Sequence, residues 1–573
     1  MSEFGYKITN YQAGSIIEHN NGVREMYDKK DAMLTNSLFL DFLENNGLNV
    51  WKEKSTRDVI CIEFDYGSRS YEEDVKKLQK SKEKTLASEN YTEEQKEEIA
   101  QRYDELIERA NANKDKYVKL SAQDIRILFY TKGVDIKYKI YSRKKDAPPQ
   151  YEVIHYKMLY RTPGKAKKGS CMFIREELYD IARDYLYMGI QLPEKNAPIV
   201  EIGAYSSLVT STIVDKINIS PEDILVIKDV DSYFNTKAIS IETNEKNQCI
   251  AVHKDDYQVK NTLFDGQALI DSSIFPDWAD GYILLRHHMC KMAAFCSNIQ
   301  MFFKDYYGDN YSSAVVKDMF GKEHYAKDIK LITTENAMKW MKMPNVDYDY
   351  WANKVHENGD MFGIVKTAHP SKYGDVQRMS YQMVNALDIS SMNHVTQRSV
   401  DYIESLKFDD EVFLQFLRDR SNFSNDFDVL LALVEQNRDF MNSDYFRDRR
   451  HRITTAYLLN VKTGKVIQNA DNLTIVGSPY AMLLHAVGED VEKDNTLVPE
   501  DGAIQCYTER FDDGEYLAEF RSPFNAKHGM GYMHNVLSPT IKKYFKLGKL
   551  CIAVNMIHTV FQPRNNGSDQ DFS

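Results

Sequence analysis

The chain has 573 residues, which exceeds the size that one hydrophobic core usually serves and predicts three or more structural units. Hydrophobic residues at 43% and charged residues at 28% exclude a collagen-like or disordered protein. A net charge of −12 disfavours a nucleic-acid partner, although a basic channel can lie inside an acidic exterior.

The N-terminal sequence and the hydropathy pattern bear on localisation. The start MSEFGYKITNYQ has neither the basic nor the apolar region of a signal peptide, and no run of eighteen apolar residues occurs. We therefore predict a cytoplasmic protein without a membrane partner. The seven cysteines contain no Cys-x-x-Cys pair, which predicts free thiols, with a metal cluster at Cys290, Cys296, His287 and His288 as the minor alternative.

Residues 1–170 are predicted to form an N-terminal α+β region. The apolar run Val59–Phe64 is typical of a strand, and so is Ile125–Tyr130. Between them, residues 71–117 carry many charges, a capping-box pattern at Thr92–Gln95 and apolar residues at helical spacing, which predicts a helical hairpin insertion. This insertion is either an arm for a partner or a solvated excursion.

Residues 171–350 begin with a predicted helix from about 173 to 188, followed by two predicted buried strands, Ala197–Ile202 and Ile224–Ile227. Residues 351–450 have mainly helical periodicity.

From residue 451 to 573 the sequence again favours short strands. Thr454–Leu459 and Leu473–Gly477 are predicted strands, and Cys551–Asn555 is another near the end. A polar loop follows, in which Asp569 and Asp571 are alternate residues whose carboxylates can point to one side. Magnesium prefers such oxygen ligands. A terminal acidic turn can also be without function.

The order of motifs in this last region resembles that of a known superfamily. Phe520-Arg521-Ser522-Pro523 precedes the acidic loop by a strand-rich stretch. An Arg-x-Pro motif before an Asp-rich loop is similar to the second double-psi β-barrel of the two-barrel RNA polymerases, which comprise the multisubunit enzymes, the RNA-silencing RNA-dependent RNA polymerases and single-chain phage enzymes. The resemblance covers roughly residues 260–573 and implies that Arg521 contacts the nucleotide sugar while Asp569 and Asp571 bind Mg²⁺.

The resemblance extends to the cations of a first barrel. Arg286 and Lys291 follow an Asp-Gly turn, Phe264–Gln267, that looks like the corresponding element of the silencing polymerases. The stretch from 330 to 339 resembles the one that supplies a further lysine, Lys339 or Lys342. These cations would neutralise the phosphates of the incoming nucleotide and the transcript. The apolar run 289–303 equally allows a core helix with two surface cations.

Two lysines lie on a predicted loop between the barrels. Lys366 and Lys372 are candidates for contacts with a nucleic-acid backbone, and a solvated loop is the alternative. The segment Met379–Gln382 also resembles a helix between the barrels of the silencing polymerases.

The sequence patterns predict an α+β chain, and the resemblance implies two double-psi β-barrel regions, 171–350 and 451–573, joined by a helical linker, 351–450. The implied function is template-directed RNA synthesis with Mg²⁺, a nucleic-acid template and nucleoside triphosphates, and the relatives suggest a phage or mobile element. Asp571 is followed only by Phe572 and Ser573, so the third aspartate of the family loop is missing. A truncated polymerase and a non-catalytic nucleic-acid-binding or structural protein with a degenerate fold therefore both remain open, as does an unrelated interaction protein built around 71–117.

Overall fold

The computed structural model describes residues 5–88, 91–140, 150–161, 171–374, 376–379, 387–422, 425–498, 500, 503–521 and 529–565. The chain divides into two compact units. The first unit comprises 1–216 with the short segments 287–289 and 342–354, and the second comprises 217–286, 290–341 and 355–573.

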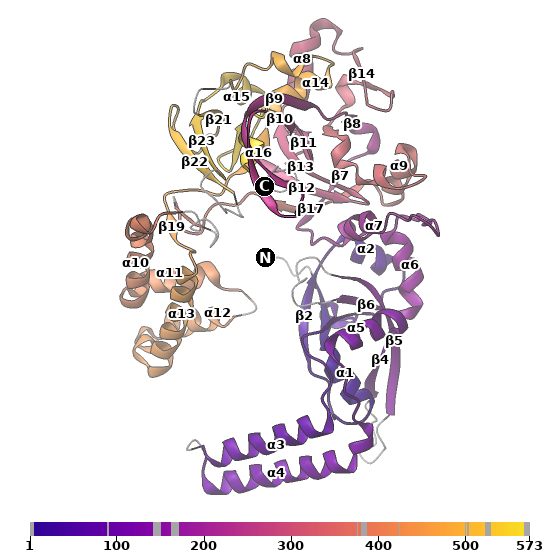
Figure 1. The fold of residues 1–573 in the computed structure, drawn as a ribbon, viewed down its shortest axis with the longest axis vertical. Helices are drawn as coiled ribbons and strands as arrows, with labels where there is room; N and C mark the ends of the chain where they lie inside the picture. Colours follow the sequence, from indigo (N-terminus) through magenta and orange to yellow (C-terminus); the bar gives the residue numbers. More distant parts are fainter. Residues whose placement is uncertain are drawn as a thin grey trace. The chain divides into compact units, whose positions relative to one another are not determined.

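The first unit is built on one mixed sheet in the order β2-β1-β3-β6-β5-β4 (Figure 1). Its only parallel neighbours among the printed pairings of described residues are β1 and β3. Helices α2 and α6 pack on one face through a core that includes Phe39 and Tyr185, and α1 and α5 pack on the other through a core that includes Ile16 and Phe129. The elements are β1 (Gly5–Gln12), α1 (Ala13–Asn20), β2 (Lys29–Thr35), α2 (Leu38–Asn45), β3 (Val59–Glu63), α5 (Ala122–Lys132), β4 (Val134–Ile140), β5 (Gln150–Arg161), β6 (Cys171–Arg175) and α6 (Glu176–Leu186).

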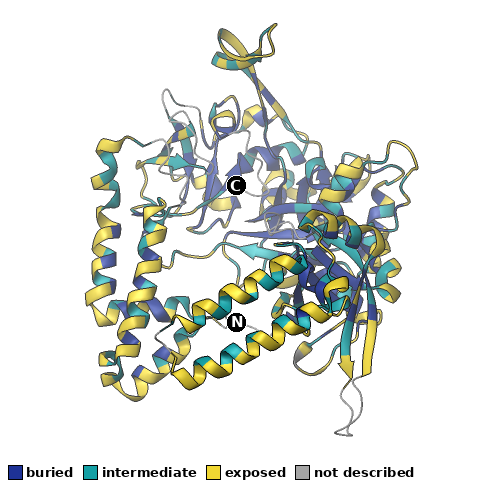
Figure 2. Cartoon of the chain, turned by 60° about the horizontal axis from the view of Figure 1, so that its bottom comes forward, coloured by how far each residue is buried: buried dark blue, intermediate teal, exposed yellow. Residues whose placement is uncertain are grey.

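The predicted helical hairpin is confirmed as α3 (Tyr71–Leu86) and α4 (Glu93–Ala112). Each helix begins with a capping box, formed by Ser70 with Glu73 and by Thr92 with Gln95. Ala110 is the only residue of these two helices that is buried. Figure 2 accordingly colours most of both helices as exposed or half-buried.

Two predicted strands of the first unit are helices. Ile125–Tyr130 lies in α5, because Ser121 and Asp124 form a capping box and Ile125 and Phe129, one helical turn apart, are both buried. Ala197–Ile202 enters α7 (Ile199–Tyr205), where Ile199 and Val200 are exposed instead of buried in a sheet.

The second unit contains two larger sheets, which curl as half-barrels (Figure 1). The first has the order β7-β17-β12-β13-β11-β16-β8 and the second has the order β20-β24-β21-β23-β22. The strands of the first sheet are β7 (Asp215–Asn218), β8 (Ile224–Ile227), β11 (Gln267–Asp271), β12 (Tyr282–His287), β13 (Cys290–Ser297), β16 (Leu331–Thr334) and β17 (Met361–Thr367). Those of the second are β20 (Thr474–Gly477), β21 (Ile504–Tyr507), β22 (Tyr516–Phe520), β23 (Met530–Asn535) and β24 (Cys551–Val554).

The two sheets repeat one topology. If β8, β11, β12, β13 and β16 are numbered in chain order, their order across the sheet is 1-5-2-4-3, and β20 to β24 have the same order. The orientations also agree: the first and fifth strands are parallel, the fifth and second antiparallel, and the second and fourth parallel in both sheets. The third and fourth strands form an antiparallel pair in the second sheet and a hairpin with a two-residue turn in the first. This duplication is not visible in the amino-acid sequence.

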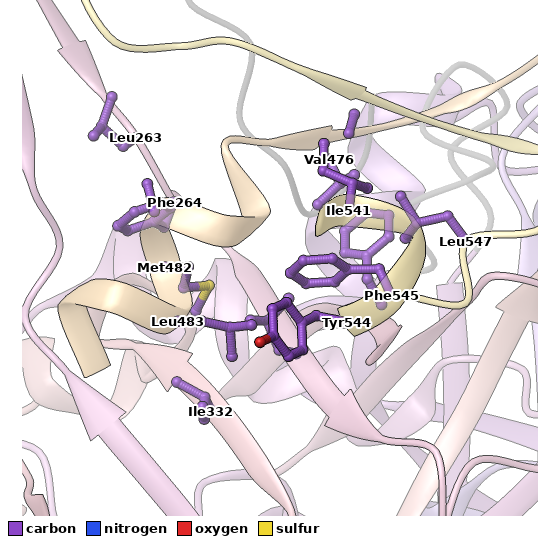
Figure 3. Packing of buried hydrophobic residues seen from close by; sticks show 14 of the residues in the cluster. Leu263, Phe264, Ile332, Val476, Met482, Leu483, Ile541, Tyr544, Phe545 and Leu547 are labelled. Carbon is purple, nitrogen blue, oxygen red and sulfur yellow. The ribbon is translucent and has the colours of Figure 1, made fainter. Parts of the chain in front are cut away.

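The two sheets share one hydrophobic core. Residues of the first sheet and its helix, such as Leu269 and Phe303, belong to the same buried cluster as Val476, Tyr507 and Ile552 of the second. Figure 3 shows part of this cluster, in which Ile332 and Phe264 of the first sheet region lie near Met482 and Leu483 of the second. The side chain of Gln267 also joins the sheets, because its Nε2 donates to the carbonyl of Gly477 at 3.0 Å and its Oε1 accepts from the same residue's N–H at 2.9 Å.

Helices lie between the two sheets in the sequence and form a smaller core of their own, which includes Phe413, Leu417 and Tyr457. Thr454–Leu459, a predicted strand, lies within α13, whose N-terminus is capped by Ser443 and whose buried residues Phe446, Thr454 and Tyr457 follow the helical period. The helices of this unit are α8 (Ile299–Tyr307), α10 (Met392–Phe408), α11 (Asp410–Arg420), α12 (Phe427–Gln436), α13 (Asp444–Lys462), α14 (Pro479–Ala486), α15 (Pro539–Tyr544) and α16 (Phe561–Arg564). Its other strands are β9 (Asp231–Thr243), β10 (Cys249–Thr262), β14 (Val315–Lys317), β15 (Glu323–Tyr325), β18 (Gln377–Arg378) and β19 (Ile467–Gln468). Most of α9 (Tyr348–Glu357) belongs to the first unit.

The fold is therefore mixed α+β, as predicted. Ile224–Ile227, Leu473–Gly477 and Cys551–Asn555 are strands in the places expected. Among the described residues, no helix combines the length and the apolar character needed to cross a membrane. Full closure of either sheet into a double-psi barrel stays a prediction.

Candidate functional site

The predicted Arg521 lies at the base of the predicted acidic loop. It follows the last residue of β22, and its Nη1 donates a hydrogen bond to the backbone carbonyl of Asn565. Asn565 is the residue directly before the loop segment 566–573. Asp569 and Asp571 themselves lie outside the described residues. The Arg-x-Pro arginine and the start of the acidic loop, 44 positions apart in the chain, are thus adjacent in space.

A half-buried carboxyl group accompanies this arginine. Glu519 lies two positions before Arg521 on β22 and pairs across the sheet with Gly531. Burial raises the pKa of Glu519 to about 7, and the nearby Asn565 side chain and Arg521 guanidinium partly oppose that rise. Gly531 leaves room for this carboxyl group, because a Cβ there would lie only 2.8 Å from the Glu519 Oε2. Glu519 is therefore a protonatable group in contact with the base of the loop.

The segment before the acidic loop is also held by the end of β10. The Nε2 of Gln562, in α16, donates to the Thr262 carbonyl at 3.1 Å, and its Oε1 accepts from the Thr262 N–H at 3.0 Å. The Nδ2 of the fully buried Asn261 donates to the carbonyls of Met556 at 2.9 Å and Thr559 at 2.8 Å. Side chains that donate and accept in pairs fix a backbone in register, so the loop starts from a defined position.

Arg286 and Lys291 lie on the hairpin of β12 and β13. A two-residue turn joins the strands, so Arg286, two residues before the turn, and Lys291, two residues after it, occupy opposite positions. Arg286 is 9% exposed and its Nη1 donates to the Leu285 carbonyl at 2.8 Å, whereas Lys291 is half-buried. The alternative of a core helix is wrong for Lys291, because residues 290–297 form a strand and the helix begins only at Ile299.

Lys339 joins these cations near Cys290. The backbone of Cys290 bridges that of Met338, the residue before Lys339. Burial raises the pKa of the Cys290 thiol to about 12, and the positive charges of Arg286 and Lys339 oppose the rise. The alternative lysine, Lys342, instead donates to the Tyr205 hydroxyl at 3.3 Å within the first unit.

The predicted turn Phe264–Gln267 contacts a second half-buried carboxyl group, that of Asp229. Asp229, at the end of β8, accepts from the Phe264 N–H at 3.0 Å and from the Asn336 Nδ2 at 2.8 Å. Burial raises the pKa of Asp229 to about 6, although its hydrogen bonds oppose this, and the neighbouring Asp265 carboxylate adds to the rise. Gly266 has a φ of +75°, which explains the glycine of this Asp-Gly turn.

The two lysines predicted to contact nucleic acid have different positions. Lys366 lies in strand β17, opposite Leu284 of β12, and not in a loop. Lys372 does lie in a loop, and its Nζ is 3.4 Å from the carbonyl of Asp419 near the end of α11. A lysine near a helix C-terminus neutralises the helix dipole, so Lys372 has a structural partner available.

Sequence reasoning named the candidate cations but not the polar groups that contact Arg521 or hold the segment before the loop. Glu519 could have been found, because it shares one face of an alternating strand with Arg521. Nothing in the sequence marks Asn565, Asn261 or Gln562, since their importance depends on contacts with residues tens to hundreds of positions away.

The cysteines were the alternative candidates for metal ligands. The cysteines are free, with Cys249 exposed and the other six buried. Within the described ranges, no group of three or more His, Cys, Asp or Glu side chains could hold a metal ion, so the alternative cluster at Cys290 and Cys296 is not formed there.

Comparison of the sequence with known proteins finds neither a matching family model nor a matching curated protein.

Proposed function

We propose that the chain is a template-directed RNA polymerase, a nucleotidyltransferase with Mg²⁺ as cofactor, or an incomplete form of one. One observation carries the proposal: Arg521 is hydrogen-bonded to Asn565, the residue that leads into the loop with Asp569 and Asp571. The contact links Arg521 to the residue directly before the acidic loop, and a polymerase of the two-barrel kind needs both motifs at one place. The repeated topology of the two sheets supports the same proposal, because it provides two similar scaffolds in one unit.

The proposed chemistry divides between the two sheets. Asp569 and Asp571 supply carboxylate oxygens, which are the ligands that Mg²⁺ prefers. Bound Mg²⁺ would stabilise charge on the attacking and leaving oxygens of the phosphoryl transfer. Arg521 would orient the nucleotide sugar, and Arg286, Lys291 and Lys339 would neutralise the phosphates.

The test is incorporation of labelled ribonucleotides on single-stranded DNA and RNA templates by the complete gene product that contains this chain. We expect Mg²⁺-dependent incorporation that is abolished by chelation. Asp569→Ala and Asp571→Ala should abolish it, and Arg521→Ala or Arg286→Ala should lower it by about 100-fold or more, as when a preorganised transition-state contact is lost.

Lys317→Ala is the matched control, since Lys317 is an exposed cation of the same unit, on β14, with only a surface ion pair to Glu323. It should leave incorporation unchanged. Incorporation that survives the aspartate substitutions would overturn the assignment. Template binding without any incorporation would instead favour the non-catalytic nucleic-acid-binding protein.

A further inference from the structure

A cluster of oxygen-bearing side chains lies in the first unit, where the parallel strands β1 and β3 end. Gln12 is opposite Glu63 in this pair, and Asn10 is two residues before Gln12. Because side chains alternate between the faces of a strand, these three side chains share one face of the sheet. Asn10 and Glu63 are each 3% exposed, whereas Asp65, just beyond the end of β3, is exposed. The cluster is therefore buried at one end and accessible to solvent at the other.

Two amide groups face two carboxylates in this cluster. The Asn10 Nδ2 donates to the Glu63 Oε1 at 2.9 Å. The Gln12 Nε2 donates to the Glu63 Oε2 at 2.9 Å and to the Asp65 Oδ2 at 3.0 Å. The two amide oxygens, Asn10 Oδ1 and Gln12 Oε1, are buried and have no hydrogen-bond partner among the described residues. Since a buried acceptor without a partner is costly, the need to satisfy Glu63 does not by itself explain this pair of amides.

We propose that Asn10, Gln12, Glu63 and Asp65 form a binding site for a divalent cation of the calcium type. Ca²⁺ takes about six to eight oxygen ligands from carboxylates, amide groups and water. Half a turn of a side-chain amide exchanges its oxygen and nitrogen in nearly the same volume, so both amide oxygens can face the carboxylates when a cation lies between them. Oxygens about 3 Å apart then fit adjacent positions around an ion that holds each of them at about 2.4 Å.

The ligand set favours Ca²⁺ over Mg²⁺. Two carboxylates alone are a poor metal site, and the two amide oxygens bring the number of protein ligands to four. Mg²⁺ gives up its water reluctantly and usually keeps several water ligands, whereas Ca²⁺ accepts amide oxygens in a flexible geometry. Water can complete the coordination from the exposed side of Asp65.

A lysine competes for the same position. Lys30 lies opposite Asn10 on β2, and its Nζ is 3.4 Å from each carboxylate oxygen of Glu63. The Lys30 side chain is 62% exposed, so it can move into solvent and leave Glu63 to another cation. Because of this competition and the small number of carboxylates, we expect a Kd for Ca²⁺ of about 10⁻⁴ to 10⁻³ M. The bound ion would hold β1 to the end of β3 and so stabilise the first unit.

The experiment measures the binding of radioactive Ca²⁺ to the chain by equilibrium dialysis. Asp569→Ala and Asp571→Ala are present in every protein, so the acidic loop of the proposed polymerase cannot contribute and the outcome is independent of that assignment. Asp65→Asn should weaken binding about 10-fold or more, because a charged ligand is lost. Asp31→Asn is the matched control, since Asp31 is an exposed carboxylate on β2 next to Lys30 and therefore on the other face of the sheet. It should bind Ca²⁺ like the parent.

Two further variants separate a cation site from a network of hydrogen bonds. Lys30→Met removes the competing ammonium group and should tighten Ca²⁺ binding about 3-fold or more. Asn10→Asp places a second carboxylate beside the buried Glu63, which should lower the thermal midpoint in the absence of Ca²⁺. Added Ca²⁺ should restore the midpoint of Asn10→Asp, because the ion binds the folded state and neutralises both charges. A network without a cation predicts the same loss and no recovery.

Four results would count against the proposal. It is overturned if the protein binds no Ca²⁺ at about 5 mM, well above the expected Kd. It is also overturned if Asp65→Asn binds Ca²⁺ as tightly as Asp31→Asn, or if Ca²⁺ leaves the midpoint of Asn10→Asp unchanged. Binding of Mg²⁺ as tight as that of Ca²⁺ would overturn the assignment to calcium.

Discussion

Glu519 is the side chain with the clearest expected pH dependence. Its pKa of about 7 in the folded protein exceeds the value of about 4.3 for an exposed glutamate, so the folded state holds its proton more tightly. The resulting stability is complete below about pH 4 and is lost as pH rises through about 7. Glu519→Gln, which stays neutral, should therefore gain stability relative to the parent between about pH 5 and about pH 8, by on the order of 1–3 kcal/mol.

The measurement is denaturant unfolding of both proteins at the two pH values. Glu515→Gln is the control, because Glu515 is an exposed carboxylate in the turn before the same strand and should show no such change. An equal difference between Glu519→Gln and the parent at both pH values would mean that Glu519 is not buried as described.

The contrast between Arg521 and Asn565 explains what could be predicted about single side chains. Arg521 could be singled out from the sequence because it lies in a short local motif, Arg-x-Pro. Asn565 could not, because its place beside Glu519 and Arg521 is created only when β22 and the C-terminal segment meet. The predicted roles of Arg286 and Lys339 stay predictions, although the charges of both side chains lower the pKa of the Cys290 thiol against the effect of its burial.

Among the secondary-structure elements, the α3–α4 hairpin is expected to be dispensable for folding. In the distal part of the hairpin, α3 and α4 are held together mainly by contacts such as the exposed ion pair between Lys82 and Asp104 at 2.7 Å. Such a pair contributes little to the free energy of unfolding. Replacing residues 80–105 by a short Gly-rich turn should change the free energy of unfolding of the first unit by no more than about 0.5 kcal/mol. Thermal and denaturant unfolding of the shortened protein measure this.

The base of the hairpin provides the comparison. Asp74 accepts a hydrogen bond from the Tyr117 hydroxyl at 2.9 Å and pairs with Arg69, which in turn pairs with the buried Glu18. Asp74→Ala should destabilise the first unit by about 1–3 kcal/mol, because it leaves these partners unsatisfied. A distal deletion as costly as Asp74→Ala would show that the hairpin is part of the folding unit.

Helices and strands were predicted correctly where periodicity and turn chemistry agree. The capping-box pattern at Thr92–Gln95 and the charge pattern predicted α3 and α4, and short apolar runs predicted β20 and β24. Ile125–Tyr130 and Thr454–Leu459 were wrong because a short run of β-branched and aromatic residues fits a buried helix face equally well. Tertiary packing decided both cases, through Phe129 in one and Tyr457 in the other.

Over the chain as a whole, the repeated 1-5-2-4-3 order of the two sheets is the feature that the sequence conceals most completely. The order is a matter of long-range pairing, and no two equivalent strands need share residues beyond an apolar pattern. The two sheets share one hydrophobic core, because residues of both belong to the same buried cluster. The second unit should accordingly unfold as one cooperative body and not sheet by sheet.

Gly281 tests this cooperativity, because it lies where the two sheets meet. It precedes β12 with a φ of +67°, and its carbonyl accepts the Cys296 N–H at 2.9 Å. A Cβ at this position would collide with the backbone carbonyl of Leu547 and the Sγ of Cys551, both from the second sheet's side of the core. Gly281→Ala should therefore lower the free energy of unfolding by about 4 kcal/mol or more, from the left-handed backbone and from the clash together.

Gly321→Ala is the control. Gly321 has a φ of +85° and open space around it, so this substitution should lower the free energy of unfolding by only about 1 kcal/mol. Hydrogen exchange should then show Gly281→Ala accelerating exchange in β24 as well as in β12. Acceleration confined to β12 would show that the sheets are stable independently.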